Sequence, residues 1–236
     1  MTTLTVPARF NGPPQSANGG WFAGHLAQEC PTTPSQPAVT VRLSAPPPLE
    51  VPMTLERDGS SLRLTDQDTL VAVAAPAPPL PDPAVPPVSY ADAVAAGAAY
   101  EGLDGHPFPT CYSCGTGRTD GLALRPGRVA TGQGEYAAAW VPDDVTPEIV
   151  WAALDCPGGW SAGIAGRPMV LGTMTAQVEA LPDVGEECVV MAWPRGGAGR
   201  RFDSASALYG REGRLLARAE AVWIAVDPAA VRPVGR

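Results

Sequence analysis

The stretch that decides the fold is Gly19-Gly20-Trp21-Phe22-Ala23-Gly24, which returns in the second half of the chain as Gly158-Gly159-Trp160-Ser161-Ala162-Gly163. Two further pairs of segments match in the same order, 39–45 with 174–180 and 70–74 with 215–219. Three matches whose spacings differ only by loop lengths predict one supersecondary unit used twice. Two copies are too few for a solenoid, so we expect a paired, pseudo-symmetric arrangement.

Each copy is predicted to contain one helix and an antiparallel set of strands. In the first copy, Ser16 or Asn18 caps a helix that carries Trp21, His25 and Leu26 on one face. In the second copy, a turn at 142–147 and an apolar run at 149–154 lead into the Gly-Gly-Trp helix, which we expect to begin at Gly158. Strands are predicted over 4–10, 38–45, 50–57, 60–65, 68–75, 133–141, 170–181, 186–194, 201–209 and 214–226.

Composition divides the chain into three parts. Residues 1–75 and 131–236 hold the two copies, and residues 76–130 connect them. The connection begins with a Pro- and Ala-rich linker over 76–87, followed by a short helix capped by Ser89.

Charge and composition narrow the class of protein. The net charge of −8 and the pI near 4.7 argue against nucleic acid or an anionic membrane as the main partner. All sixteen basic residues are Arg, a composition typical of GC-rich, actinobacterial-like genomes. The N-terminus shows no signal-peptide pattern and no apolar run has the length of a membrane helix, so we expect a soluble cytoplasmic protein. Five cysteines without a secretory signal do not predict a disulfide framework.

The predicted architecture, a helix wrapped by an antiparallel sheet and used twice, resembles a double hotdog fold of the α+β class. The two Gly-Gly-Trp stretches and the run 213–219 carry the resemblance. They are similar to the helix start and the final hairpin of type II, single-chain acyl-CoA thioesterases, over most of 4–75 and 133–226. The resemblance implies an acyl thioester substrate, on coenzyme A or on an acyl carrier protein, bound between the two halves.

The glycines suggest how such a substrate is held. A glycine-rich helix start directs backbone N–H groups and the positive end of the helix dipole at its ligand, and a thioester oxyanion suits that place. The residues expected to bind substrate there are Gly19, Gly20, Gly158, Gly159 and Trp160.

Asp155 is the candidate carboxylate for orienting the attacking water, because the family places an acid at this junction. The competing interpretation is a helix cap. The family pairs its acid with a Ser or Thr on the next strand, where Thr173 and Thr175 stand, and with a Gln on the last strand, where this chain has Ala221.

Four other residues are candidates for contacts with substrate. Asn18 is a candidate for polarising the substrate, and the alternative is that it only caps its helix. His25 is a candidate for the catalytic histidine of a hydratase or dehydratase, and the alternative is that it only packs. Arg200 and Arg201 follow a Gly-rich turn and suit the phosphates of coenzyme A or an acidic carrier protein, or are simply solvated.

No cofactor is required by this chemistry, but one cluster has the spacing of half a zinc site. Cys111 and Cys114 form a C-x-x-C pair near His106, and Cys156 is the candidate to complete the coordination. The alternative is a reduced, packed loop.

The resulting hypothesis is a thioester hydrolase that acts as a monomeric pseudo-dimer or as a homodimer of fused chains. A hydratase or dehydratase that uses His25 or His106, and a non-catalytic acyl-binding protein, remain the alternatives.

Overall fold

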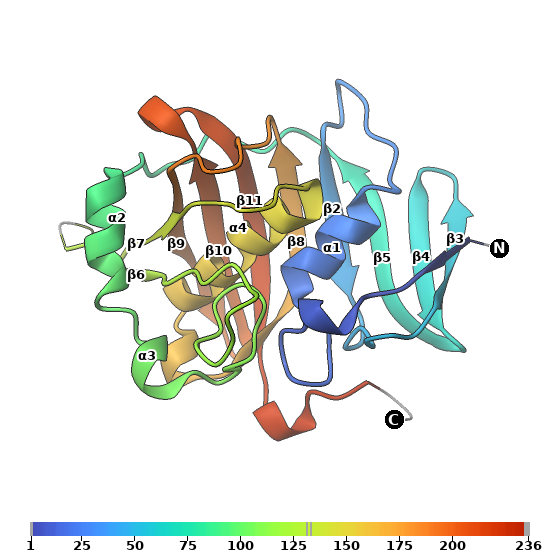
Figure 1. Ribbon diagram of the computed structural model, residues 1–236. Coiled ribbons are helices and arrows are strands. Elements are labelled where there is room, and N and C mark those ends of the chain that lie inside the picture. The colour runs from blue at the N-terminus through green and yellow to red at the C-terminus, as the bar shows by residue number, and fades with distance from the viewer. Residues whose placement is uncertain (1, 131, 133, 234–236) are drawn as a thin grey trace.

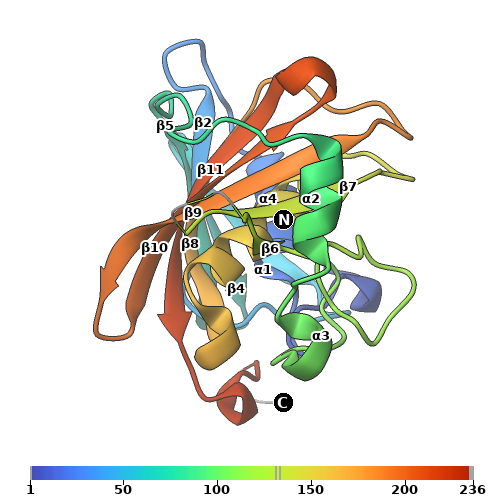
Figure 2. The ribbon, with the colours of Figure 1, turned by 90° about the vertical axis from the view of Figure 1, so that its left-hand side faces the viewer.

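The computed structural model describes residues 2–130, 132 and 134–233, so the first residue of the strand predicted over 133–141 lies outside the described residues. Its core elements are one antiparallel sheet and two helices, α1 (Gly19–Ala27) and α4 (Pro147–Ser161), that lie together on one face of the sheet (Figure 1). Seen from the side, α2 (Tyr90–Gly97) and α3 (Gly102–Gly105) lie farther from the central strands (Figure 2).

The strands agree closely with those expected from sequence alternation. Those before the connection are β1 (Thr2–Leu4), β2 (Ala38–Leu43), β3 (Met53–Asp58), β4 (Ser61–Asp66) and β5 (Thr69–Ala77). Those after it are β6 (Gly127–Arg128), β7 (Tyr136–Trp140), β8 (Met169–Val178), β9 (Cys188–Ala198), β10 (Arg201–Tyr209) and β11 (Leu215–Ala225). The strand predicted over 4–10 is shorter than expected, because Pro7 is followed by a 3-10 turn at Ala8–Phe10.

The order of the strands is mirrored about the middle of the sheet. It reads β1-β3-β4-β5-β2-β8-β11-β10-β9-β7-β6, so β2 and β8 are neighbours at the centre. There Thr40 pairs with Thr175, and their hydroxyl oxygens lie 2.8 Å apart. The two halves therefore form one continuous sheet, and a single apolar core spans both of them.

Two of the three sequence matches coincide with equivalent places in this sheet. Val41 pairs with Ala74 on one side of the centre, and Ala176 pairs with Ala219 on the other. These four residues occupy corresponding positions of the segments that matched in sequence, so the matches at 39–45 and 70–74 fall at equivalent places in the sheet.

The third match, between the Gly-Gly-Trp stretches, predicted that both stretches begin a helix. This prediction is wrong for the second stretch. Gly19 is the first residue of α1, whereas Gly158 lies near the C-terminal end of α4, which begins at Pro147 after a Thr146 cap. The helix continues through Pro157 and ends before Gly163, whose φ of 95° suits a glycine after a helix C-terminus.

Glycines place α1 directly on the backbone of α4. A side-chain carbon added at Gly20 would lie 2.4 Å from the Cβ of Asp155, and one added at Gly24 would lie 2.7 Å from the Cα of Glu148. The two helices therefore run antiparallel, and their contact has no room for a methyl group at either position. Close approach of a second backbone is the reason for the glycines in α1.

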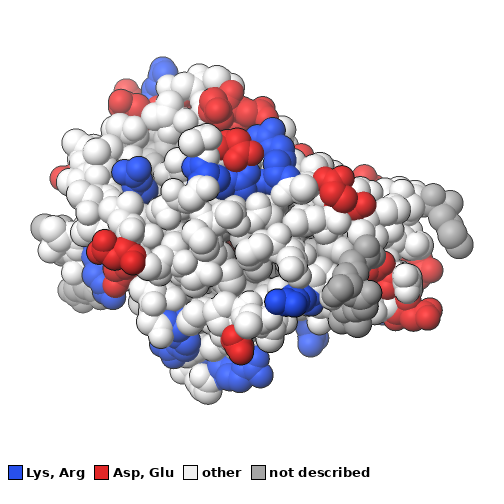
Figure 3. All heavy atoms as spheres, turned by 60° about the horizontal axis from the view of Figure 1, so that its bottom comes forward, with Lys and Arg blue, Asp and Glu red and all other residues white. Residues whose placement is uncertain are grey.

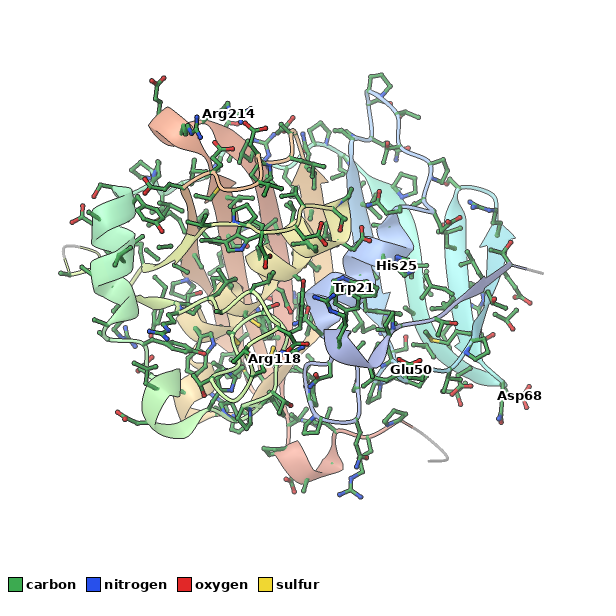
Figure 4. All side chains as sticks on the ribbon, viewed as in Figure 1. Trp21, His25, Glu50, Asp68, Arg118 and Arg214 are labelled. Atoms are coloured by element: carbon green, nitrogen blue, oxygen red, sulfur yellow. The ribbon has the colours of Figure 1, made fainter. Side chains whose placement is uncertain are left out.

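The connecting segment crosses over α4 on the side away from the sheet (Figure 1). Ser113 donates a hydrogen bond from its hydroxyl to the carbonyl of Ala152 in α4, at 2.8 Å. Arg118, labelled in Figure 4, donates to the Asn11 side chain and to the carbonyls of Thr110 and Arg9. The segment is thus fastened both to α4 and to the chain that precedes α1.

Among the described residues, the helices are all too short or too polar to span a membrane.

The helix contact predicts the effect of Gly24→Ala. Alanine normally stabilises a helix by up to about 1 kcal/mol relative to glycine. Here the added methyl would overlap Glu148 and Trp151, so we expect the free energy of unfolding to fall by about 1–3 kcal/mol in chemical denaturation. Gly105→Ala in α3 is the matched control, because no atom lies within 4 Å of the added carbon. A Gly24→Ala protein at least as stable as the wild type would contradict this packing.

Candidate functional site

A cavity of about 240 Å³ lies at the N-terminal end of α1, between α4 and the ends of β8 and β11. Its walls are mainly apolar and include Leu171 from β8, Trp223 from β11 and Phe108 from the connecting segment. Val231, from the C-terminal segment, also borders it. The face that carries this segment has its charged side chains mostly towards the margins, and the part between them is uncharged (Figure 3).

Asp155 is the buried acid of this cavity. Its side chain projects from the middle of α4, and only 3% of the residue is exposed. One carboxylate oxygen, Oδ2, accepts hydrogen bonds from the Gly20 amide at 3.0 Å and from Asn18 Nδ2 at 3.1 Å. The other oxygen, Oδ1, is buried and has no partner among the described residues. The hydrogen bonds to Oδ2 thus hold the carboxylate in place, and Oδ1 keeps an unused capacity to accept a hydrogen bond.

The environment of Asp155 disfavours its charged form. Burial is the main cause that raises the pKa of Asp155 from 3.8 to about 7, and the nearby Cys111 adds to this. The hydrogen bonds from Gly20 and Asn18 act in the opposite direction.

Some of the first backbone amides of α1 donate hydrogen bonds within the protein, and one is left without an acceptor beside the cavity. Asn18 caps the helix, because its Oδ1 accepts from the Trp21 amide at 2.8 Å. The Gly20 amide binds Asp155. The Gly19 amide is the first of the helix, where no intrahelical acceptor exists, and it has no acceptor among the described residues. Gly19 borders the cavity, so a hydrogen-bond donor at the positive end of α1 is available there.

A cluster of thiols forms the wall beside Asp155. The sulfurs of Cys111, Cys114 and Cys156 lie within 4.8 Å of one another, and all three residues are buried. Hydrogen bonds from the Cys114 and Cys156 thiols hold the pKa of Cys111 well below its usual range. His106 lies at the edge of this cluster, with its Nε2 3.2 Å from the sulfur of Cys114.

The structure brings together part of the predicted site. Asn18, Gly19, Gly20 and Asp155 meet at one end of the cavity, although Gly20 contributes its amide to Asp155 and not to a ligand. Asp155 does not cap its own helix, because it is the ninth residue of α4, but its carboxylate accepts the Gly20 amide in the first turn of α1.

Other predicted residues lie elsewhere. Thr173 and Thr175 do not line the cavity; Thr175 bonds to Thr40 on the sheet face opposite the buried Met174. The expectation that Gly158 and Gly159 present free amides is wrong, because both lie inside the last turns of α4. Gly158 packs on Ser204, Gly159 packs on Trp223, and the fully buried Trp160 donates its ring N–H to the sulfur of Cys114.

His25 and the two arginines are also outside the cavity lining. His25 stacks on Trp21, with ring centroids 4.9 Å apart, and Figure 4 shows both side chains projecting from α1. Arg200 and Arg201 are exposed in the β9–β10 hairpin. Arg200 donates to the carbonyl of Ala225, and neither arginine lines the cavity.

The sequence interpretation missed the apolar lining. Leu171 and Trp223 are buried on the helix-facing side of their strands, in register with each other. Strand alternation was the available signal, since Trp223 follows Ala219 and Ala221 on the same face. The end of that sheet face that the helices leave uncovered depends on where α1 begins. The repeat predicted a second helix start at Gly158, so it did not indicate which end this is.

Comparison with solved structures identifies the architecture. A hotdog-fold protein of unknown function from Alicyclobacillus acidocaldarius aligns with a TM-score of 0.59 at 18% identity, covering 96% of this chain and 93% of the other. The chain has a hotdog fold. A tesB protein from Mycobacterium avium subspecies paratuberculosis aligns with a TM-score of 0.58 at 11% identity, covering 94% and 91% of the two chains.

A third hotdog structure, the acyl-CoA thioesterase II TesB2 from Mycobacterium marinum, aligns with a TM-score of 0.53 at 11% identity, covering 92% and 91%. No protein-family model matches the sequence, and no curated protein matches it. At these identities the shared property is the hotdog fold, over almost the whole length of the chains.

The buried acid predicts how stability depends on pH. The pKa of Asp155 is about 7 in the folded protein and near 3.8 when unfolded. Between these values the unfolded chain loses the proton while the folded protein keeps it, so the stability contribution is present below about pH 4 and is lost as pH rises to 7. The Asp155→Asn protein has no titratable group at this position, so it does not lose this contribution to stability as the pH rises. From pH 5 to pH 8 we expect its free energy of unfolding to gain about 2–3 kcal/mol relative to wild type in urea denaturation. If the free energies of unfolding of the two proteins changed with pH in the same way, the prediction would be contradicted.

Proposed function

We propose that this hotdog protein hydrolyses an acyl thioester in the cavity between the N-terminus of α1 and the middle of α4. The observation that carries the proposal is the arrangement of Asp155 and Gly19. Asp155, which has a buried carboxylate oxygen without a partner, and Gly19, which has an unused helix amide, both line one apolar cavity. Hydrolysis of a thioester needs both groups, one for the water and one for the carbonyl oxygen.

The proposed reaction uses the two groups in sequence. The thioester carbonyl oxygen accepts a hydrogen bond from the Gly19 amide, and Asp155 Oδ1 accepts one from a water molecule. Asp155 takes the proton as the water oxygen attacks the carbonyl carbon, and the resulting oxyanion is stabilised at the positive end of α1. Collapse of this intermediate breaks the carbon–sulfur bond, and the thiol leaves with the proton from Asp155.

The lining supports a compact apolar acyl group. Leu171, Trp223 and Ile164 offer an apolar surface beside Asp155, and a volume of about 240 Å³ favours a short chain or a single ring. We propose coenzyme A as the thiol, because one of the structures that share this fold is the acyl-CoA thioesterase II TesB2 from Mycobacterium marinum. Arg200 and Arg201, exposed in the β9–β10 hairpin, are the arginines that we propose for the phosphates of that group.

The mirrored sheet supports two hotdog units within the one chain. We assign residues 1–75 to the first, 131–236 to the second and 76–130 to the connection. Asp155 then comes from the helix of the second unit and Gly19 from the helix of the first, so the site needs both. A single chain supplies this pair, and assembly into larger oligomers is not needed for the site.

The first test concerns Asp155. Asp155→Asn keeps the size of the side chain and removes its ability to accept a proton, so we expect kcat for hydrolysis of acyl-CoA to fall by about 10²–10⁴-fold. Glu148→Gln is the matched control, because it removes the other acid of α4 and lies outside the cavity lining. Its rate should stay within about twofold of wild type.

The test needs a panel of short, branched and aromatic acyl-CoA substrates in a thiol-release assay. An Asp155→Asn protein as active as wild type would remove Asp155 from the reaction. A wild-type protein that binds these thioesters but turns over none of them would instead identify a binding protein.

The second test concerns the Gly19 amide. Proline is well tolerated as the first residue of a helix, so Gly19→Pro removes this N–H and preserves the start of α1. Because any side chain at Gly19 meets Leu171, Gly19→Ala is the matched comparison that adds the carbon and keeps the N–H. We expect kcat of Gly19→Pro to be about 10²–10³-fold below that of Gly19→Ala. Equal rates for the two variants would show that this amide does not bind the oxyanion.

A further inference from the structure

The wall of the cavity beside Asp155 contains more thiol groups than packing requires. Three of the five cysteines of the chain converge here, from the connecting segment and from α4. We propose that the protein binds a zinc ion through four side chains of this wall: Cys111, Cys114, Cys156 and His106.

The distances between the sulfurs suit tetrahedral zinc. With zinc–sulfur bonds of about 2.3 Å, two thiolates of a tetrahedral site lie about 3.8 Å apart. The sulfurs of Cys111 and Cys156 are 3.6 Å apart, and the Cys114 sulfur lies within 4.8 Å of both. The three sulfurs are therefore close enough to one another to share one metal ion.

A disulfide explains the cluster less well. It would join two sulfurs at about 2.05 Å and leave the third thiol without a role. All five cysteines are free. A metal uses all three thiols, and the C-x-x-C spacing of Cys111 and Cys114 is the usual spacing for two zinc ligands on one turn.

His106 supplies the fourth ligand. Its Nε2 lies 3.2 Å from the Cys114 sulfur, close to the spacing of neighbouring ligands, although it is not among the atoms that all lie within 4.8 Å of one another. Its Nδ1 accepts a hydrogen bond from the Phe108 amide at 2.9 Å, which puts the proton on Nε2. Ligation through Nε2 moves that proton to Nδ1, so the Phe108 amide must turn away as the ring closes on the metal.

N–H groups around the cluster are placed to stabilise deprotonated, negatively charged sulfurs. Trp160 directs its ring N–H at the Cys114 sulfur, 3.5 Å away, and Asn18 directs its Nδ2 at the Cys111 sulfur, 3.6 Å away. N–H donors around the sulfurs are typical of the outer shell of metal sites, where they orient the ligands.

Four protein ligands make this a closed, structural site. It joins a segment with little regular structure of its own, 106–126, to α4 at the residue next to Asp155. The ion would therefore hold the cavity wall and the position of the carboxylate, and the reaction proposed above does not pass through it.

The experiment measures metal in the full-length protein. Zinc is determined by mass spectrometry after expression in zinc-supplemented medium and removal of loosely bound metal, for wild type, Cys114→Ser and His106→Ala. Cys30→Ser and Cys188→Ser are the matched controls, because both residues are buried cysteines outside the cluster. We expect one zinc ion per chain in wild type and in both controls, and none in Cys114→Ser.

His106→Ala tests the fourth ligand separately. We expect its zinc affinity, measured by competition with a chromophoric chelator, to fall by at least about 10–100-fold. An unchanged affinity would overturn the assignment of His106.

A second measurement does not depend on the folding of variants. Wild-type protein stripped of metal is titrated with Co²⁺, which reports tetrahedral thiolate ligation by its visible absorption. We expect these bands to appear and to saturate at one equivalent. Wild-type protein that contains no zinc and shows no cobalt–thiolate bands would overturn the proposal, whatever its thioesterase activity.

Discussion

The contact between α1 and α4 at Gly20 is the constraint on which the rest of the structure depends. The absence of a side chain at Gly20 lets the first turn of α1 rest on Asp155, so that the Gly20 amide reaches the carboxylate at 3.0 Å. This single contact sets how the two halves of the molecule meet above the sheet. It also fixes where the cavity begins, because the preceding residue, Gly19, lines the cavity and faces Leu171.

The same contact explains how a carboxylate is kept inside the protein. Burial raises the free energy of its charged form, while the helix amide and Asn18 lower it. Burial outweighs the two hydrogen bonds, so the neutral and the charged carboxyl are about equally populated near pH 7. A buried carboxyl with a raised pKa reduces the stability of the fold as the pH rises and the group becomes charged. Functional sites commonly reduce the stability of the protein that carries them.

The polar end of the cavity is assembled from three distant parts of the chain. Asn18 comes from the start of α1, Asp155 and Cys156 come from α4, and Cys111 comes from the connecting segment. Arg118 and Ser113 fasten that segment to its two neighbours by hydrogen bonds to backbone carbonyls. The connection is therefore a wall of the site as well as a linker between the two halves of the sheet.

Local sequence by itself determined most of the strands and two of the three repeat matches, and it limited the cap of α1 to Ser16 or Asn18, because alternation and turn residues act over a few positions. It also singled out Asp155 and the cysteines. Only the tertiary structure decided that Gly158 lies in the last turns of a helix and not at its start, since the Gly-Gly-Trp pattern does not specify which end of a helix it occupies. It likewise decided that Thr175 faces away from Asp155, because the side of a strand that meets the helices depends on the register between β2 and β8.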